Sequence, residues 1–181
     1  MTQQSQENAA LNTLGLGALT AGGSLPLAAD HIGVAVYDVD EAAARYGQMF
    51  GITTWRRIRF SAVAQYRASV HRITGIAATG SLGTIGLEVV APDEGRWTAS
   101  DVLAERGESA YHAGFRVSDL PRALDECRAA GMTPTLIGTA DNGIPAFSYI
   151  ESSQVTAVLI ELVAEKLPPS FLTEVTTRAV G

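Results

Sequence analysis

The sequence of 181 residues has a single cysteine, a single lysine and no long hydrophobic run. Cys127 has no partner for an intrachain disulfide, and its helical surroundings favour a buried apolar role over a reactive thiol. No apolar run approaches the ~20 residues of a membrane helix, and no basic residue precedes the first apolar stretch as in a secretory signal. The net charge of −6 argues against broad nucleic-acid binding. These absences favour a cytoplasmic protein without membrane or nucleic-acid partners.

What the chain does contain is a repeated strand pattern. A histidine, glycine, valine and aspartate occur at residues 31, 33, 36 and 38 and recur at residues 112, 114, 117 and 119. The offset is constant, 112 − 31 = 81. Two later apolar segments also match, GLEVVA at residues 86–91 and LIELVA at residues 159–164. We therefore interpret the chain as two copies of one small unit. The chain is long enough for the two copies to share one hydrophobic core.

Each copy reads as a strand, a helix and three more strands. In the first copy we expect the later strands near residues 53–60, 66–73 and 82–90, with glycines providing the turns. The predicted parts are a flexible arm at 1–28, a first βαβββ module at 29–95, a linker helix within 96–109, a second βαβββ module at 110–165 and a tail at 166–181. The tail is compatible with a short helix or with a disordered end.

The fold class expected from this order is α+β. Alternation in the first strand of each module places aliphatic residues on one face, which should pack under the helix, and the histidine on the other. Gly33 and Gly114 follow the histidines by two residues and leave space beside them. We therefore predict that the two modules form a curved mixed sheet around a cavity, and that His31 and His112 face that cavity.

Two glutamates complete a candidate metal site. Glu88 and Glu161 each lie within an apolar strand, where an ionised carboxylate is costly unless it is paired or faces a polar cavity. Imidazole and carboxylate ligands together suit one divalent ion such as Zn, Fe, Ni, Co or Mn. A separation of only 24 positions between Glu88 and His112 favours a site within one chain over a site shared between two.

These motifs resemble the vicinal oxygen chelate superfamily, which is the glyoxalase, bleomycin-resistance and extradiol-dioxygenase fold. The resemblance covers roughly residues 29–165, and within the superfamily the chain is most similar to the methylmalonyl-CoA epimerase-like branch. The segments that carry it are DHIGVAV at 30–36, LEVVAP at 87–92, YHAGFRV at 111–117 and LIEL at 159–162. The resemblance implies that His31, Glu88, His112 and Glu161 bind one divalent metal.

The resemblance also implies a metal-dependent enzyme that acts through an enolate on a small carbonyl or acyl-CoA substrate. An epimerase or isomerase is the first expectation. The epimerase branch carries a further carboxylate before the first metal-binding glutamate, but residues 61–87 contain no Asp or Glu. His71 lies near the corresponding place and is a candidate base, with a partly exposed surface histidine as the alternative. Glu161 is the other candidate base.

Substrate contacts are expected from the arginines of the first module and from Arg116. Arg56, Arg57, Arg59, Arg67 and Arg72 form a cluster that could hold a CoA phosphate or a carboxylate, or lie on a solvated strand face. Arg116 shares a strand face with His112. We name Arg116, Arg67 and Tyr66 as candidate substrate-binding residues.

Other functions remain open at this point. The alternatives are a glyoxalase-like lyase or a hydrolase of secondary metabolism, and a non-catalytic ligand-binding or resistance protein of the same fold. Four intact ligand positions argue against the non-catalytic reading. Because a two-module sheet leaves edges and apolar surface that a partner can cover, we expect a homodimer.

Overall fold

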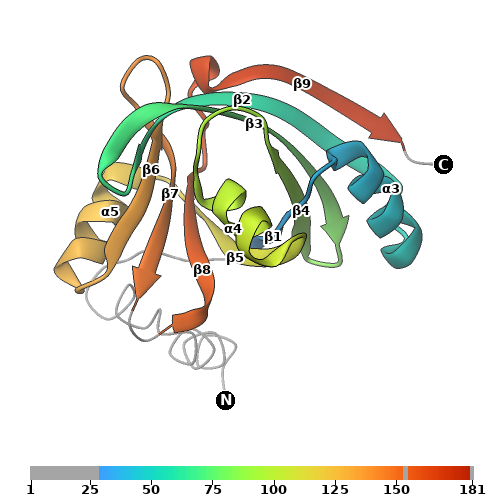
Figure 1. Cartoon of the computed structure of the whole chain (residues 1–181), viewed down its shortest axis with the longest axis horizontal. Helices are drawn as coiled ribbons and strands as arrows, with labels where there is room; N and C mark the ends of the chain where they lie inside the picture. Colours follow the sequence, from blue (N-terminus) through green and yellow to red (C-terminus); the bar gives the residue numbers. More distant parts are fainter. Residues whose placement is uncertain (1–28, 153–154, 180–181) are drawn as a thin grey trace.

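The computed structural model describes residues 29–152 and 155–179, and these form one curved sheet with three α-helices (Figure 1). The first module comprises β1 (Ala29–Ala35), α3 (Val39–Phe50), β2 (Thr54–Tyr66), β3 (Ser69–Leu82) and β4 (Ile85–Pro92). The linker helix α4 (Thr98–Arg106) follows. The second module comprises β5 (Ser109–Val117), α5 (Leu120–Ala129), β6 (Thr133–Thr139), β7 (Pro145–Ser152) and β8 (Val155–Ala164). The short 3₁₀ turn η1 (Pro169–Phe171) and β9 (Leu172–Ala179) end the described chain.

Matching aspartates start the first helix of each module. The Asp38 carboxylate accepts hydrogen bonds from the backbone N–H groups of Asp40 and Glu41, and Asp119 accepts one from Arg122 N–H. These bonds satisfy N–H groups that have no partner inside the helix. Gly51 ends α3 in the left-handed conformation (φ 71°), which a glycine adopts without strain. The repeat seen in the sequence is thus a repeat of strand, cap and helix.

The strands join in the order β3-β4-β1-β5-β8-β7-β6-β2-β9. Strand β2 also pairs with β3, so the sheet curves round and closes on itself. The two modules meet where β1 and β5 pair in antiparallel fashion, and within each module the first and last strands are parallel. This mixed, curved α+β sheet confirms the predicted fold class.

Three apolar clusters form the core. One lies between α3 and the first module and another between α5 and the second, as the alternation of the strands predicts. The α5 cluster contains Cys127, which is fully buried and whose thiol pKa burial raises to about 11. The third and largest cluster lies inside the curve of the sheet and includes Phe60, Trp97 and Phe147. Helix α4 lies under the arch of β2 and β3 (Figure 1).

The prediction for the middle strands of the first module was wrong in detail. The segment 66–73 does not form a strand of its own but spans the turn of a long hairpin, with Arg67 in the left-handed region (φ 54°). Gly75 and Gly80 lie inside β3 rather than in turns. A Cβ on Gly75 would lie 2.7 Å from the Phe60 ring, and one on Gly80 would lie 2.4 Å from Ile52. These glycines therefore permit close packing, and the turn before β4 occurs at Gly83 (φ 66°).

The C-terminal tail differs from both alternatives considered. After the short η1, residues 172–179 are neither a helix nor disordered, because they form β9, which pairs in antiparallel fashion with residues 54–60 of β2. Its β-branched residues, Thr173, Val175, Thr176 and Thr177, favour an extended chain. The tail therefore extends the sheet along the part of β2 that β6 does not reach.

The predicted N-terminal arm, residues 1–28, lies outside the described residues. Among the helices that the structure describes, none is long and apolar enough to span a membrane. The cytoplasmic location and the limits of the parts at 1–28, 29–95, 96–109, 110–165 and 166–181 stay predictions.

Candidate metal centre

Four strands that lie side by side at the junction of the modules each contribute one side chain to a single cluster. They are β4, β1, β5 and β8, and they carry Glu88, His31, His112 and Glu161 respectively. One nitrogen or oxygen from each side chain lies within 4.8 Å of the others. The duplication of the strands thus brings all four predicted ligands together within one chain.

Each histidine lies over the glycine of the other module. Gly33 is the register partner of His112, and Gly114 is the register partner of His31. A Cβ on Gly33 would lie 1.9 Å from His112 Cε1, and one on Gly114 would lie 2.1 Å from His31 Cε1. Any other residue at either position would displace an imidazole ring. The glycines of the repeat are therefore part of the site.

The ring nitrogens and the carboxylates converge on the same small volume. His31 Nε2 lies 2.8 Å from His112 Nε2, 3.0 Å from Glu161 Oε2 and 3.4 Å from Glu88 Oε2. His112 Nε2 lies 3.3 Å from Glu161 Oε2 and 3.6 Å from Glu88 Oε2. His31, His112 and Glu161 are buried. Two acidic and two basic groups thus share a site with little solvent.

The charges of the cluster shift its ionisation. Burial alone would lower the pKa of His31, but the charge of Glu88, the hydrogen bond with Asp30 and the nearby Glu161 carboxylate outweigh it and raise the pKa to about 12. Burial alone would raise the pKa of Glu88, but the charge of His31 outweighs it and holds that pKa far below its usual range. In the metal-free protein the cluster is therefore held together by a protonated His31.

The chemistry of the donors fits a divalent metal ion. Glu161 Oε2 is buried and accepts no hydrogen bond from the residues that the structure describes, although it points at both imidazoles. A buried carboxylate oxygen without a donor is costly unless a cation satisfies it. Two imidazole nitrogens and two carboxylates are a ligand set for Zn and similar divalent ions.

A carboxylate outside the cluster orients only one of the two histidines. His31 Nδ1 lies 2.9 Å from Asp30 Oδ2, and Arg116 Nε donates to Asp30 Oδ1 at 2.6 Å. Such a carboxylate fixes the ring and raises the basicity of the nitrogen that binds a metal. In contrast, His112 Nδ1 is buried with no hydrogen-bond partner among the described residues. Arg116, a predicted substrate-binding residue, thus supports His31 through Asp30.

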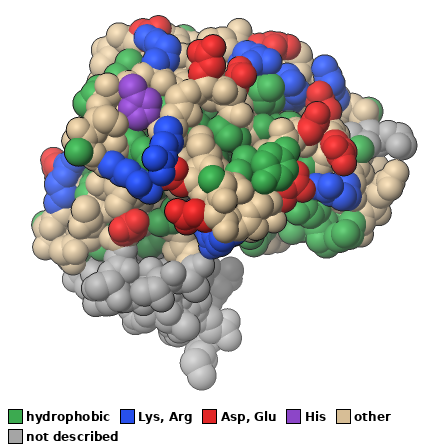
Figure 2. Space-filling model, in the orientation of Figure 1, with side chains coloured by type: hydrophobic (Ala, Val, Ile, Leu, Met, Phe, Trp, Pro, Cys, Tyr) green, Lys and Arg blue, Asp and Glu red, His purple; other side chains and the backbone are tan. Residues whose placement is uncertain are grey.

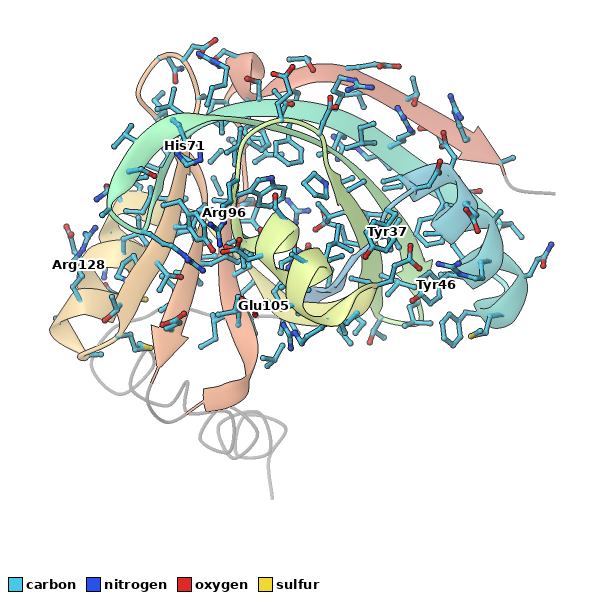
Figure 3. All side chains as sticks on the ribbon, in the orientation of Figure 1. Tyr37, Tyr46, His71, Arg96, Glu105 and Arg128 are labelled. Carbon is cyan, nitrogen blue, oxygen red and sulfur yellow. The ribbon has the colours of Figure 1, made fainter. Side chains whose placement is uncertain are left out.

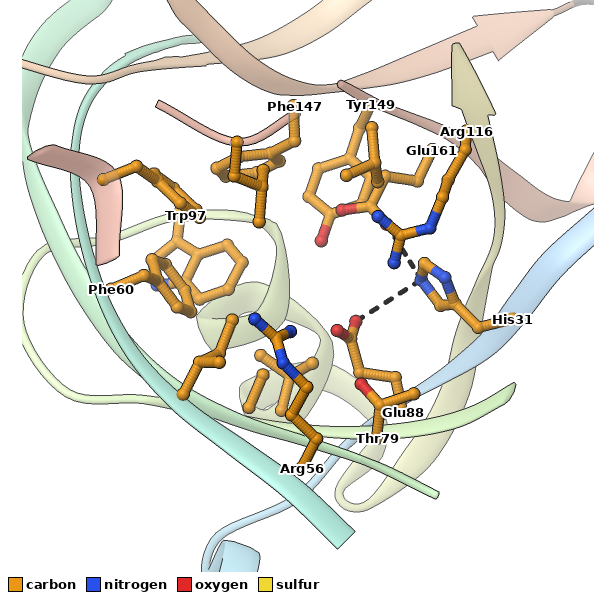
Figure 4. Close-up of a pocket in the computed structure, with 16 residues that line it drawn as sticks. His31, Arg56, Phe60, Thr79, Glu88, Trp97, Arg116, Phe147, Tyr149 and Glu161 are labelled. Atoms are coloured by element: carbon orange, nitrogen blue, oxygen red, sulfur yellow. Dashed lines mark ion pairs between the residues drawn. The ribbon is translucent and has the colours of Figure 1, made fainter. Parts of the chain in front are cut away.

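The cluster opens into a cavity inside the curve of the sheet (Figure 4). Its volume of about 70 Å³ is far below the ~300–1,000 Å³ of pockets for drug-sized ligands, so it suits the reactive end of a small substrate. Polar residues line the end near the cluster, and aromatic residues line the other end. The lining includes His31, Glu88, Glu161, Thr79, Arg56, Arg116, Tyr149, Phe60, Trp97, Phe147, Leu167 and Phe171.

Three predicted site residues do not line this cavity. His71 is near the surface, where its Nε2 lies 2.7 Å from the Arg96 carbonyl oxygen and its Nδ1 lies 3.2 Å from Ser69 Oγ (Figure 3). Tyr66 and Arg67 both donate hydrogen bonds to Asp101, at 2.7 Å and 2.6 Å. All three lie at the hairpin turn between β2 and β3 or next to it. The structure thus brings neither the candidate base His71 nor two of the candidate substrate contacts to the cluster.

Several cavity residues were not singled out from the sequence. Leu167 and Phe171 come from the tail, whose strand was not recognised. Tyr149 lies beside Glu161 in the register of β7 and β8, and its hydroxyl is 2.9 Å from that of Tyr111. Burial raises the pKa of Tyr149 well above its usual range, so the hydroxyl stays protonated. The sequence signal for Tyr149 is its position opposite Glu161, which appears when strands β7 and β8 are aligned.

Comparison with known proteins identifies the family of the chain. The family model of the Glyoxalase/Bleomycin resistance protein/Dioxygenase superfamily matches residues 30–147, and the chain belongs to this superfamily. No curated protein sequence matches the chain. The solved structures that it resembles include methylmalonyl-CoA epimerases, which confirms the predicted resemblance at the level of the fold.

Three solved structures illustrate this likeness. The methylmalonyl-CoA epimerase of Mycobacterium tuberculosis is 22% identical, with a TM-score of 0.55 over 80% of this chain and 92% of that one. A Streptomyces coelicolor methylmalonyl-CoA epimerase variant in complex with 2-nitronate-propionyl-CoA is 20% identical, with a TM-score of 0.54 over 78% and 98%. A hypothetical protein from Bacillus halodurans is 16% identical, with a TM-score of 0.52 over 79% and 97%. At these identities the likeness establishes the fold and not the reaction.

Proposed function

We propose that the protein is a divalent-metal-dependent enzyme of the epimerase or isomerase type. It would remove a proton next to a carbonyl group of a small carbonyl or acyl-CoA substrate, through an enolate. The observation that carries this proposal is the cluster of His31, Glu88, His112 and Glu161 at the polar end of a cavity. The epimerases of similar fold support the choice of reaction.

The four residues of the cluster would hold the ion. When bound, the ion would supply Lewis-acid stabilisation of the negative charge that an enolate places on oxygen. Tyr149 offers a protonated hydroxyl at the cavity wall, where it can donate a hydrogen bond to a substrate oxygen. Arg116 lines the same wall, and its Nε holds Asp30 in place behind His31.

We assign removal of the proton to Glu161. Among the residues that line the cavity, the only carboxylates are Glu88 and Glu161. A base must come within hydrogen-bond reach of the proton it removes. His71 is bonded to a backbone carbonyl outside this lining and is not needed in the proposal. A carboxylate has two oxygens, so Glu161 can hold an ion and still offer a proton acceptor.

Proton exchange with solvent tests this assignment. Metal-loaded protein in deuterated water should place deuterium next to the carbonyl of methylmalonyl-CoA or of a small 2-oxo acid. Glu161→Gln should lower the exchange rate by about 100-fold or more, because general-base catalysis contributes ~10²–10⁴-fold. His71→Ala is the matched control and should keep most of the rate. Exchange that survives Glu161→Gln and is lost in His71→Ala would contradict the assignment.

A second candidate is a glyoxalase-like lyase or isomerase that works with a single base. Epimerisation inverts a carbon centre and needs a proton donor on each face of the enolate. Among the described residues, the cavity is lined by no carboxylate besides those of the cluster, which favours removal and return of the proton on one face. Deuterium uptake with retained configuration at the carbon would support the single-base enzyme, and uptake with inversion would support the epimerase.

The remaining expectations stay proposals. A CoA thioester is a reasonable substrate because a similar fold binds 2-nitronate-propionyl-CoA. The homodimer was inferred from open sheet edges. Strand β2, however, pairs with both β3 and β6, so it covers the edges of these two strands within the chain. The identity of the metal also stays open among Zn, Co, Mn, Ni and Fe.

A further inference from the structure

The pleat of β2 places one arginine of the first module on the wall of the cavity. Arg56, Ile58 and Phe60 alternate along β2, and all three line the cavity. Their neighbours Arg57 and Arg59 lie on the opposite face of the strand, where they pair with Asp40 at 3.4 Å and Asp93 at 2.8 Å. The pleat of the β2 backbone, and not the choice of side-chain rotamer, therefore directs Arg56 towards the cavity.

The register of the sheet aligns Arg56 with the metal centre. Arg56 is the partner of Thr79 on β3, and Thr79 is the partner of Glu88 on β4. Two strand spacings separate Arg56 from Glu88, or about 10 Å between their backbones. Figure 4 shows the Arg56 guanidinium and the Glu88 carboxylate pointing into the same cavity. An arginine thus faces a reacting centre across a gap that a small substrate can fill.

Arg56 is one of only two arginines that have no ionic partner among the residues that the structure describes. Acidic and basic side chains are intermixed over the visible surface (Figure 2). Within the described residues, every other arginine except Arg106 forms an ion pair with a carboxylate; the paired ones are Arg45, Arg57, Arg59, Arg67, Arg72, Arg96, Arg116, Arg122, Arg128 and Arg178. Arg106 ends helix α4 and does not line the cavity. Arg56 is thus a guanidinium at the cavity that no carboxylate of the described residues pairs with.

We propose that Arg56 binds a carboxylate of the substrate and so determines specificity for anionic substrates. The guanidinium matches a carboxylate with two parallel hydrogen bonds. The substrate would be a small carbonyl compound with a carboxylate at the end away from the metal centre. This inference rests on the proposed function, because it assumes that the carbonyl end lies at the cluster.

Two matched 2-oxo acids test the inference by binding alone. 2-Oxoglutarate and 2-oxopentanoate share the 2-oxo acid end, but only the first has a distal carboxylate. Calorimetric titration of Zn²⁺- or Co²⁺-loaded protein should give a dissociation constant about tenfold or more lower for 2-oxoglutarate. Arg56→Met should remove this preference, and Arg56→Lys should retain part of it. Arg106→Met removes the same charge elsewhere and should leave the preference intact.

The outcomes separate this inference from the proposed function. Absence of a preference in the wild type, or a preference that survives Arg56→Met, would overturn the role of Arg56. Adenosine 3′,5′-bisphosphate serves as the probe for the phosphates of CoA. If Arg56→Met weakens only the binding of adenosine 3′,5′-bisphosphate, the group that Arg56 binds is a CoA phosphate and the proposal is wrong. Failure of proton exchange with the preference intact would instead reject the proposed reaction alone. Arg56→Gln is a second neutral variant should the Met variant not fold.

Discussion

The two modules present matching rows of five residues to the metal centre, and the rows differ at their outer ends. One row starts at His112 of the second module and continues through four residues of the first, Gly33, Glu88, Thr79 and Arg56. The other row starts at His31 of the first module and continues through four residues of the second, Gly114, Glu161, Tyr149 and Leu136. The three inner members are the same in type, and the two outer members are not.

This difference separates the part of the site that binds metal from the part that selects a ligand. The inner members supply the ligands and the glycines that make space for them. At the outer end of the second row, Leu136 is fully buried and does not line the cavity, and Tyr149 is 2% exposed. Arg56 in the first module is exposed and charged. Under the proposed function, the duplicated frame would hold the ion, and the divergence of one copy would shape substrate recognition.

The strongest test of the shared part is to fill the glycine positions. Gly33→Ala and Gly114→Ala should each displace an imidazole, destabilise the fold by about 1–3 kcal/mol and abolish stoichiometric metal binding. Gly131→Ala is the control, because nothing lies within 4 Å of a Cβ there and only the left-handed backbone (φ 77°) is strained. Thermal unfolding and metal titration would measure both effects. Equal metal affinity in all three variants would contradict the role of the glycines.

A second test uses the carboxylate that only one histidine has. The repeat offset of 81 aligns Asp30 with Tyr111, and only Asp30 bonds to the Nδ1 of the neighbouring histidine. Asp30→Asn should weaken metal binding by about 10- to 100-fold. Tyr111→Phe removes only the hydrogen bond to Tyr149 and should change metal affinity little. If both substitutions weaken metal binding equally, the two histidines are supported alike and the inferred difference between them is wrong.

The smallest of the three effects is the coupling of metal binding to pH. The raised pKa of His31 keeps its ring protonated at neutral pH in the metal-free protein, and a metal binds only the neutral ring. Metal binding should therefore release about one proton from His31, and the affinity should rise with pH, by up to about tenfold per unit. Calorimetry in two buffers of different ionisation enthalpy measures this release. Proton uptake on binding, or none, would contradict the ionisation inferred for His31.

The inner rows were predictable from the sequence because repetition marks them. A histidine with a glycine two residues later, found twice at one offset, indicates two equivalent strands even without coordinates. Glu88 and Glu161 stood out because a charged residue within an apolar strand is rarely buried unless it is paired. The fold class and the clustering of the four candidate ligands followed from these patterns together.

The outer ends were not predictable because they depend on register within one hairpin. The resemblance to the epimerase branch made His71 a candidate base, whereas the structure leaves His71 near the surface beside the turn at Arg67. Arg56 was one of five nearby arginines, and only the pleat of β2 distinguishes it from Arg57. The strand β9 depends on pairing with a residue range more than 100 positions away, which no local pattern reveals.

The most direct measurement is metal content by plasma mass spectrometry on protein purified without an affinity metal, beside the His31→Ala/His112→Ala double variant. We predict about one divalent ion per chain in the wild type and none in the variant. A wild type that takes up no ion after addition of Mn, Co, Ni or Zn would contradict the account. An ion retained by the variant would place the metal elsewhere and contradict it equally.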